Sequence, residues 1–276
     1  MILMKFISLI LSLSVIIILI LLILPIQIIL NIFNLRLKYT APYYFFKLLN
    51  YFMGVNIELD QESINHLRNK NDVGNLYVSN HVSFFDITTI GSLIKSSFIA
   101  KKEVKAMGIF GFLAVLNNTF FIDNTKATKA LGYSNDIQKK LLKGQNLILF
   151  PEGTTSDGSS IRSFKSSFFE SANSKYICPN SGEEKYIRVQ PITLSYLKKS
   201  GLPMGTAIRR EVAWIGDNSS IIDIMKNYLM SANVSISIKI HDPVTIDDFG
   251  DRKKLSAHCE DTILTSLTDT LHATAS

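Results

Sequence analysis

Residues 75–86 read NLYVSNHVSFFD, which places an apolar strand directly before a polar turn and an apolar helical run. The first five residues are typical of a buried strand, and His81 and Asp86 follow where that strand ends. The same arrangement recurs at 146–157, where an apolar run leads into Pro-Glu-Gly-Thr-Thr-Ser-Asp. In open α/β sheets ligands bind beyond the carboxyl ends of the strands, so both polar turns are candidate site segments.

Further short apolar runs alternate with helical segments along the chain. The strands that this pattern predicts cover 75–79, 97–100, 119–122, 146–150, 186–194, 207–213 and 235–240. Helical segments are expected at 126–142, 221–230 and 253–271. Such alternation is typical of an α/β domain whose sheet is covered on its faces. No stretch rich in Gly, Ser or Pro divides this region, so we expect one globular domain.

The N-terminal part of the chain has a different composition. No charged residue occurs between Lys5 and Arg36, and about 20 apolar residues suffice for a helix that crosses a membrane. No small-residue cleavage site follows, so we expect a retained anchor rather than a cleaved signal peptide. Pro25 leaves two forms open, a spanning helix and a re-entrant helical hairpin. The predicted domains are 1–54, a membrane anchor with an interfacial segment, and 55–276, the globular domain.

Two further segments leave alternatives open. Aromatic residues crowd 43–52, a pattern that fits both an interfacial aromatic belt and an ordinary core helix. The apolar segment 107–116 is too short to span a bilayer, so it either lines an acyl channel, dips into the interface or forms a core helix. Arg36, Lys38 and Lys47 follow the anchor, and this positive charge predicts that the globular domain lies on the cytoplasmic side.

Composition limits the classes of function. Of the 276 residues, 47% are hydrophobic and 19% are charged, with a formal net charge of +6 that favours anionic partners. The chain lacks the motifs G-x-S-x-G, H-E-x-x-H, C-x-x-C, G-x-x-x-x-G-K-[ST] and G-x-G-x-x-G. Common serine hydrolases, zincins, P-loop enzymes and dinucleotide enzymes therefore lose support. The basic residues are dispersed, which argues against nucleic-acid binding.

His81 and Asp86 are a candidate acid–base pair. Imidazole titrates near neutral pH, so His81 can take a proton from a hydroxyl group. A tight turn would bring the Asp86 carboxylate to the ring, where it would fix the tautomer as the acid of a triad does. The alternative is a capping aspartate beside a surface histidine. Ser83 stays open as a nucleophile, although its close spacing to His81 disfavours it.

Taken together, the blocks N-H-x-x-x-x-D at 80–86 and F-P-E-G-T at 150–154 resemble the 1-acyl-glycerol-3-phosphate acyltransferase family. Other stretches that look similar lie at 101–104, 121–123 and 189–192. The stretches at 201–205, 213–217 and 241–244 look most similar to a bacterial branch that includes enzymes acylating lyso-ornithine lipid. The resemblance implies an α/β fold with a mixed central sheet flanked by helices, and an N-terminal membrane-anchoring helix or helical hairpin.

The resemblance also implies a reaction. A fatty acyl group would move from acyl-CoA or acyl-carrier protein to 1-acyl-glycerol-3-phosphate and give phosphatidic acid, with His81 as general base and Asp86 as its orienting partner. No metal and no cofactor are expected beyond the acyl donor as co-substrate. Three alternatives remain: another acceptor such as lyso-ornithine lipid, an inactive membrane-tethered lipid-binding protein, and a thioesterase. The implied location is the bacterial inner membrane, with 55–276 as the acyltransferase domain on the cytoplasmic side and the bilayer as a partner.

The expected acceptor site departs from the family pattern at two positions. The family reads G-x-x-F-I-D-R, where the Arg pairs with the acceptor phosphate, but this chain has Asn118 and Asn124 in place of the Gly and the Arg. Either another cation supplies the charge or the acceptor is not a simple phosphate. The candidate cations are Lys101, Lys102, Lys126 and Arg162. The predicted substrate-binding residues are Asn80, Lys101, Asn124, Lys126, Glu152, Gly153, Thr154 and Arg162.

Overall fold

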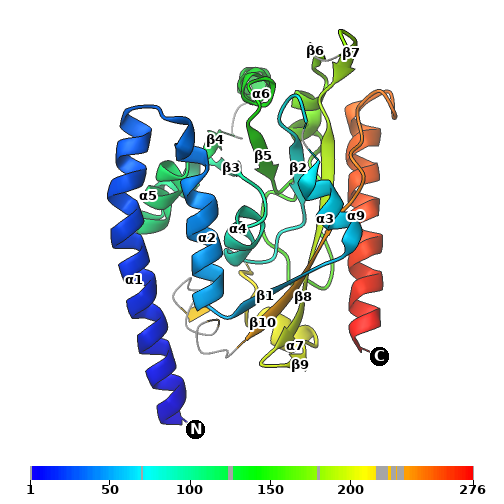
Figure 1. Cartoon of the computed structure of the whole chain (residues 1–276). Coiled ribbons are helices and arrows are strands. Elements are labelled where there is room, and N and C mark those ends of the chain that lie inside the picture. Colours follow the sequence, from blue (N-terminus) through cyan, green and yellow to red (C-terminus); the bar gives the residue numbers. More distant parts are fainter. Residues whose placement is uncertain are drawn as a thin grey trace.

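A mixed sheet forms the centre of the protein, and helices cover both of its faces (Figure 1). The structure is a computed structural model that describes residues 2–69, 71–123, 127–178, 181–215, 223–224, 228 and 233–275. Within these residues the eight strands of the sheet are β1 Val55–Leu59, β2 Leu76–Ser79, β3 Ser96–Lys101, β4 Phe120–Ile122, β5 Asn146–Leu149, β8 Val189–Lys199, β9 Leu202–Pro203 and β10 Val234–Ile240. A separate hairpin consists of β6 Lys175–Ile177 and β7 Glu184–Tyr186.

The strand order is β1-β10-β8-β2-β5-β3-β4, and β9 pairs with β8. Strands β8, β2, β5, β3 and β4 are mutually parallel, whereas β10 is antiparallel to β8 and parallel to β1. The prediction of a mixed α/β fold is therefore confirmed. Because parallel strands end at a common edge, the segments that follow β2, β3 and β5 come together there.

The helices divide between the two faces of the sheet. Their bounds are α1 Ile2–Ile32, α2 Ala41–Phe52, α3 Gln61–Arg68, α4 Phe85–Gly91, α5 Gly108–Leu116, α6 Ala127–Leu142, α7 Thr206–Arg210 and α9 Arg252–Ala275, with 3₁₀ helices η1 Arg36–Tyr39, η2 Lys102–Ala106 and η3 Ser166–Ala172. Core side chains of α1, α2 and α4 pack on one face. Side chains of α6, α9 and η3 pack on the other.

Successive side chains of the central strands enter the two hydrophobic cores on opposite faces of the sheet. In β2, Tyr77 joins the core beneath α2 and α4, whereas Leu76 and Val78 join the core beneath α6 and α9. Strand β5 does the same, with Ile148 on the first face and Leu147 on the second. All four residues of β2 are buried, which is why its apolar side chains point to both faces of the sheet rather than alternating with exposed polar ones.

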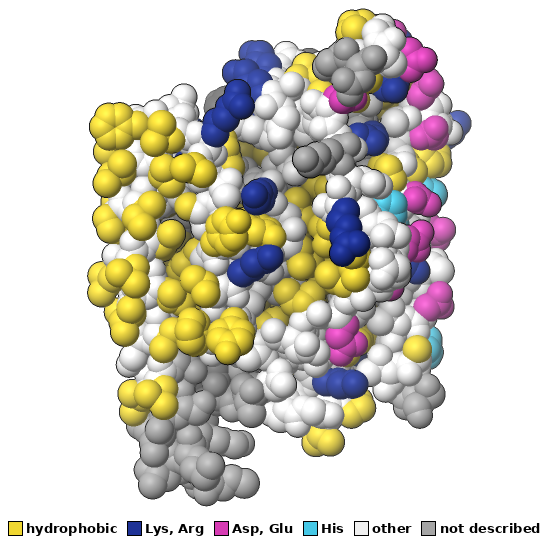
Figure 2. All heavy atoms as spheres, viewed as in Figure 1, with side chains coloured by type: hydrophobic (Ala, Val, Ile, Leu, Met, Phe, Trp, Pro, Cys, Tyr) yellow, Lys and Arg dark blue, Asp and Glu magenta, His cyan; other side chains and the backbone are white. Residues whose placement is uncertain are grey.

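Helix α1 is the expected anchor. Its segment Leu13–Ile32 has a mean hydropathy of 3.2, only 17% of the most apolar stretch is buried, and it is long and apolar enough to cross a membrane. The helix continues through Pro25, so the proline does not divide it into two parts. Figure 1 shows α1 beside α2, and Figure 2 shows hydrophobic side chains spread over the surface on this side of the molecule.

Polar side chains attach the second half of α1 to the rest of the protein. The buried Gln27 donates through Nε2 to the carbonyl oxygens of Lys38 and Leu116, each at 2.9 Å. Asn31 donates to the same Leu116 oxygen at 3.0 Å. These bonds connect α1 to η1 and to the end of α5, so this part of the anchor packs as one piece with the globular domain.

Two sequence predictions about local structure are wrong. The expected strand 207–213 lies instead on α7 and the turn after it. Arg209, Val212 and Ala213 are the buried residues there, and their spacing of three and four is helical. Strand β1 was missed, because its partly buried residues alternate with the exposed Asn56 and Glu58 at the sheet edge. The helix expected at 221–230 falls mostly outside the described residues.

The two ambiguous apolar segments are now placed. The aromatic segment 43–52 lies on α2, where Phe45 and Phe46 pack against the core while Tyr44 and Tyr51 are exposed. One side of α2 is therefore a core helix, and the interfacial belt stays a prediction. Segment 107–116 forms α5, in which only Gly111 is buried. A core helix was therefore the wrong interpretation of this segment.

The packing of α5 makes a testable prediction. A Cβ atom at Gly111 would lie 2.3 Å from the Lys105 carbonyl oxygen, a backbone atom that cannot rotate away. We expect Gly111→Ala to lower the free energy of unfolding by about 1–3 kcal/mol, as overpacking does. Gly205→Ala is the control, because that position has open space and an ordinary φ of −71°. Equal thermal midpoints for the two variants in detergent would contradict the packing described here.

Candidate active site

His81 and Asp86 meet as the sequence predicted. The His81 Nδ1 and the Asp86 Oδ2 are 2.7 Å apart, on the turn that connects β2 to α4. Asp86 lies in the first turn of α4 and is fully buried. An ionised Asp86 accepts the Nδ1 hydrogen, which leaves the His81 Nε2 unprotonated and able to act as a base.

The turn itself holds the carboxylate in place. The backbone N–H groups of Val82 and Ser83 donate to the same Asp86 Oδ2, at 2.7 and 2.9 Å. The other oxygen, Oδ1, accepts from the Tyr196 hydroxyl at 2.8 Å. Ser83 is fully buried and does not line the pocket around His81, so the geometry gives no support to a serine nucleophile.

Glu152 connects the two sequence blocks. Its Oε1 accepts from the His81 backbone N–H and its Oε2 accepts from the Arg162 backbone N–H, both at 2.7 Å. Burial raises the pKa of the Glu152 carboxyl to about 7, although these two N–H groups act in the opposite direction. The carboxylate is thus a bracket between the two turns, and its 3% exposure leaves it little contact with a ligand.

A pocket of about 260 Å³ opens beside His81. The His81 ring lies on its wall, stacked on Phe150 with ring centroids 4.0 Å apart. Gly153 and Thr154 line the same pocket. Gly153 has a φ of +69°, and a Cβ atom there would lie 3.1 Å from the Lys165 Nζ, so the turn requires a glycine at this position.

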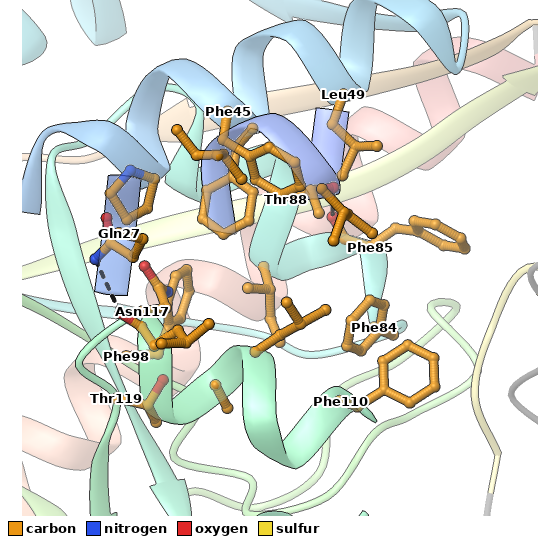
Figure 3. A pocket seen from close by; sticks show the side chains of 18 of the residues that line it. Gln27, Phe45, Leu49, Phe84, Phe85, Thr88, Phe98, Phe110, Asn117 and Thr119 are labelled. Carbon is orange, nitrogen blue, oxygen red and sulfur yellow. Dashed lines mark hydrogen bonds between the residues drawn. The ribbon is translucent and has the colours of Figure 1, made fainter. Parts of the chain in front are cut away.

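A second pocket of about 190 Å³ lies between α1, α2, α4, α5 and β3, and its lining is almost wholly apolar (Figure 3). Phe84, Phe98 and Phe110 are among the residues that line both pockets. In Figure 3, Gln27 and Asn117 lie toward one end of the apolar pocket, and Phe84 and Phe110 lie toward the other. The apolar pocket thus adjoins the pocket that contains His81.

The other predicted site residues fall into three groups. Thr154 and Lys101 line the His81 pocket together with Gly153. Asn80 is fully buried and bonds both ways with the Leu194 backbone, at 2.9 Å each, so it connects β8 to the turn. Asn124 and Lys126 lie outside the described residues.

Arg162 lies beside Glu152 and its side chain is exposed. Its N–H bonds to Glu152, and its Nε donates to the Thr155 carbonyl oxygen at 3.3 Å. Thr155 in turn donates through Oγ1 to the Trp214 carbonyl oxygen. Lys102 lies in η2 and is exposed.

Sequence reasoning gave no role to Tyr196 and Phe150, which contact Asp86 and His81 directly. The Lys165 Nζ lies near Gly153. Phe150 is part of the F-P-E-G-T block, so its place beside the histidine had a signal in the sequence. The sequence had no signal for Tyr196, because this residue lies 110 residues from Asp86 on a different strand, β8.

One group among the described residues has the spacing of a metal site. Glu62 and His66 on α3 and Asp242 after β10 offer ligand atoms within 4.8 Å of one another. None of the three lines the His81 pocket or the apolar pocket.

Comparison with known proteins agrees with this geometry. A family model described as Acyltransferase matches residues 60–195, which include the whole His81 turn and the Glu152 turn. A lyso-ornithine lipid O-acyltransferase of Brucella abortus is 32% identical over 188 residues, covering 68% of this chain and 69% of that protein. The chain belongs to the acyltransferase family. It is therefore an enzyme of acyl transfer.

Two further acyltransferases are similar to this one. A 1-acyl-sn-glycerol-3-phosphate acyltransferase of Neisseria gonorrhoeae is 35% identical over 99 residues, which is 36% of this chain and 39% of that protein. The crystal structure of the acyltransferase PlsC from Thermotoga maritima superimposes with a TM-score of 0.56 at 18% identity. That match covers 84% of this chain and 79% of the other, so the two share a fold.

The Glu152 bracket makes a prediction about pH. A carboxyl whose folded pKa of about 7 exceeds its ordinary value of 4.5 stabilises the fold most at low pH, and this contribution is lost as the pH rises through 7. The amide of Glu152→Gln does not ionise, so the variant lacks this pH-dependent contribution. We expect its stability relative to the unchanged enzyme to rise with pH, by up to about 3 kcal/mol between pH 4.5 and 8.

Thermal unfolding in detergent across this pH range is the measurement. Glu170→Gln serves as the control, because Glu170 is a partly exposed acid that pairs with Arg252 at 2.6 Å outside the site. Parallel curves for Glu152→Gln and the unchanged enzyme would show that the Glu152 pKa is not raised.

Proposed function

We propose that this enzyme transfers a fatty acyl group from a thioester donor to the free hydroxyl of a membrane lysolipid, and that lyso-ornithine lipid is the acceptor. The observation that carries the proposal is the His81–Asp86 pair on the wall of a pocket that adjoins an almost wholly apolar pocket. Acylation of a lipid hydroxyl requires a general base next to an apolar pocket that holds an acyl chain.

The chemistry follows from the roles of the two side chains. The His81 Nε2 takes the proton of the acceptor hydroxyl as its oxygen attacks the thioester carbonyl carbon. Asp86 stabilises the imidazolium ion that forms. The tetrahedral intermediate then expels the thiolate, which takes the proton back from His81 and leaves as the free thiol. The products are the new ester and CoA or the carrier thiol, with no acyl-enzyme intermediate.

The apolar pocket fits the acyl chain that is transferred. Its walls come from α1, α2, α4, α5 and β3, and its shared residues Phe84, Phe98 and Phe110 bring it to the His81 pocket. A chain in this pocket would reach the His81 pocket with its thioester end. The expectation that segment 107–116 lines an acyl channel is part of this proposal, since Phe110, Leu113 and Ala114 line the pocket.

The choice of acceptor rests on charge. A phosphate headgroup favours a bidentate arginine, and this chain has Asn124 where the family pattern has that arginine. Among the described residues of the His81 pocket, Lys101 is the lining cation, and the Lys165 Nζ lies next to Gly153. An ornithine headgroup carries a single carboxylate and no phosphate. The match to the Brucella lyso-ornithine enzyme also covers twice as much of the chain as the match to the Neisseria phosphate-acceptor enzyme, which agrees with this choice.

The second candidate acceptor is 1-acyl-glycerol-3-phosphate. Lys101 and Lys165 favour it, because two lysines beside the pocket supply charge for a phosphate without an arginine. Each lysine is a point charge, however, and does not reproduce the paired hydrogen bonds of a guanidinium group.

The proposal places the enzyme on the cytoplasmic face of a bacterial inner membrane. Helix α1 and the exposed apolar residues of α5, Ile109 and Phe112 among them, would lie in the bilayer. Lys102 and Lys105 on the adjacent η2 are exposed, where they would meet anionic headgroups or an acidic carrier protein. Thioester donors are made in the cytosol, so the pocket opening must face that side.

The acceptor can be decided with the purified full chain in mixed micelles and a labelled acyl donor, offered as acyl-CoA and as acyl-carrier protein. We expect incorporation into lyso-ornithine lipid to exceed incorporation into 1-acyl-glycerol-3-phosphate by at least about tenfold, the value of one charge-assisted contact. Equal or preferential use of the phosphate acceptor would overturn the choice of acceptor. Hydrolysis of the donor without any lysolipid would identify a thioesterase instead.

Removing the base tests the mechanism. We expect His81→Ala to lower kcat by about 10²–10⁴-fold, the usual contribution of a general base, with a smaller change in the KM of the donor. His272→Ala, at an exposed position on α9, is the matched control and should keep full activity. An active His81→Ala enzyme would exclude His81 as the base.

A further inference from the structure

The Tyr196 hydroxyl lies against the Asp86 carboxylate and has no part in the chemistry described so far. It donates to Oδ1 at 2.8 Å, and the tyrosine is fully buried. Oδ2 accepts from the His81 ring and from two backbone N–H groups. The two carboxylate oxygens therefore have separate partners, and Tyr196 is the side chain that bonds to the oxygen remote from the histidine.

Strand β8 holds this hydroxyl in place relative to the His81 turn. Tyr196 pairs with Ile236 of β10, and its carbonyl oxygen accepts from the Nε of the buried Arg209 at 3.2 Å. Two residues earlier, Leu194 bonds both ways with Asn80, the residue that precedes His81. The strand thus holds the tyrosine at a set distance from the turn that contains the base.

We propose that Tyr196 is a positioning residue that sets the basicity of His81 by withdrawing negative charge from Asp86. The inference rests on the proposed function, in which His81 is the general base. A donor on Oδ1 spreads the carboxylate charge away from Oδ2, which weakens the stabilisation of a protonated His81. The imidazole then stays neutral, and able to accept a proton, to lower pH than it would beside a carboxylate without this donor.

The charged and titratable groups that face the pair come from four elements. Glu152 bonds to the His81 backbone from the turn after β5, and Lys101 lines the pocket from the end of β3. Tyr228 is fully buried and stacks on Phe85, next to Asp86 in the chain, with ring centroids 3.8 Å apart. Tyr196 from β8 is the one of these groups that donates to Asp86 in the described residues. Removal of the Tyr196 hydroxyl therefore changes one contact of the Asp86 carboxylate and leaves its other contacts in place.

The test compares Tyr196→Phe with Tyr228→Phe. Both tyrosines are fully buried near Asp86, but the Tyr228 hydroxyl has no hydrogen-bond partner among the described residues, so the second variant controls for loss of a buried hydroxyl. For Tyr196→Phe we expect the acidic limb of the pH profile of kcat/KM to move up by about 0.5–1 pH unit. At any pH below the limb, kcat/KM should fall by about three- to tenfold. The KM of the acyl donor should stay the same. Tyr228→Phe should keep the limb where it is.

A second readout does not need an acceptor. The proton resonances of labelled histidine rings in detergent micelles report the titration of His81, assigned by its loss in His81→Ala. Tyr196→Phe should move this titration to higher pH by the same amount as the kinetic limb, while the titration in Tyr228→Phe should not move.

The two proposals fail in different ways. If the unchanged enzyme acylates no lysolipid, the proposed function is wrong, whatever the histidine titration shows. If the enzyme is active and Tyr196→Phe lowers kcat at every pH without moving the limb or the titration, Tyr196 only supports the fold and the inference is wrong. A limb that moves to lower pH would also overturn it, because the charge argument predicts the opposite sign.

Discussion

The buried carboxylate of Asp86 is the contact on which the site depends. A fully buried carboxylate is costly unless its charge is met by donors, and Asp86 has four, one from the His81 ring, two from the turn backbone and one from Tyr196. These donors come from two parts of the chain, the His81 turn and strand β8, which lie far apart in the sequence. The need to satisfy one charge therefore joins the turn after β2, helix α4 and strand β8, and it leaves the His81 Nε2 free for chemistry.

Glu152, on the turn after β5, is a second buried carboxyl group held by hydrogen-bond donors. It accepts backbone hydrogen bonds from His81 and Arg162, so the second block supports the first rather than acting beside it. Around this polar centre the walls are apolar, with Phe150 under the imidazole and the apolar pocket of α1, α2, α4 and α5 adjoining it. Helix α1, much of whose apolar surface is exposed, thus also forms a wall of the pocket.

Much of the fold could be predicted because its signals are local. The apolar runs of β2 and β5, the anchor of α1 and the spacing of His81 to Asp86 are each contained in a short stretch of sequence. The failures have the opposite cause. The expected strand at 207–213 became α7 because Arg209 turns inward to bond with Met204 and Tyr196, a tertiary contact that no local pattern shows. The edge strand β1 was not expected because its polar residues Asn56 and Glu58 interrupt the apolar run.

By itself, the sequence determined which groups are present: a histidine with an aspartate five residues on, a glycine turn and an apolar N-terminal segment, each carried by residues close together in the chain. Only the tertiary structure decided how they work together. It placed Glu152 and Asn80 in hydrogen bonds that connect the His81 turn to other parts of the chain, and it brought α5 and α1 together as walls of one pocket. It also brought Tyr196 to Asp86 across 110 residues. The physical reason is that hydrogen bonds and dispersion contacts act over a few ångströms, and residues distant in sequence reach that range only once the sheet has formed.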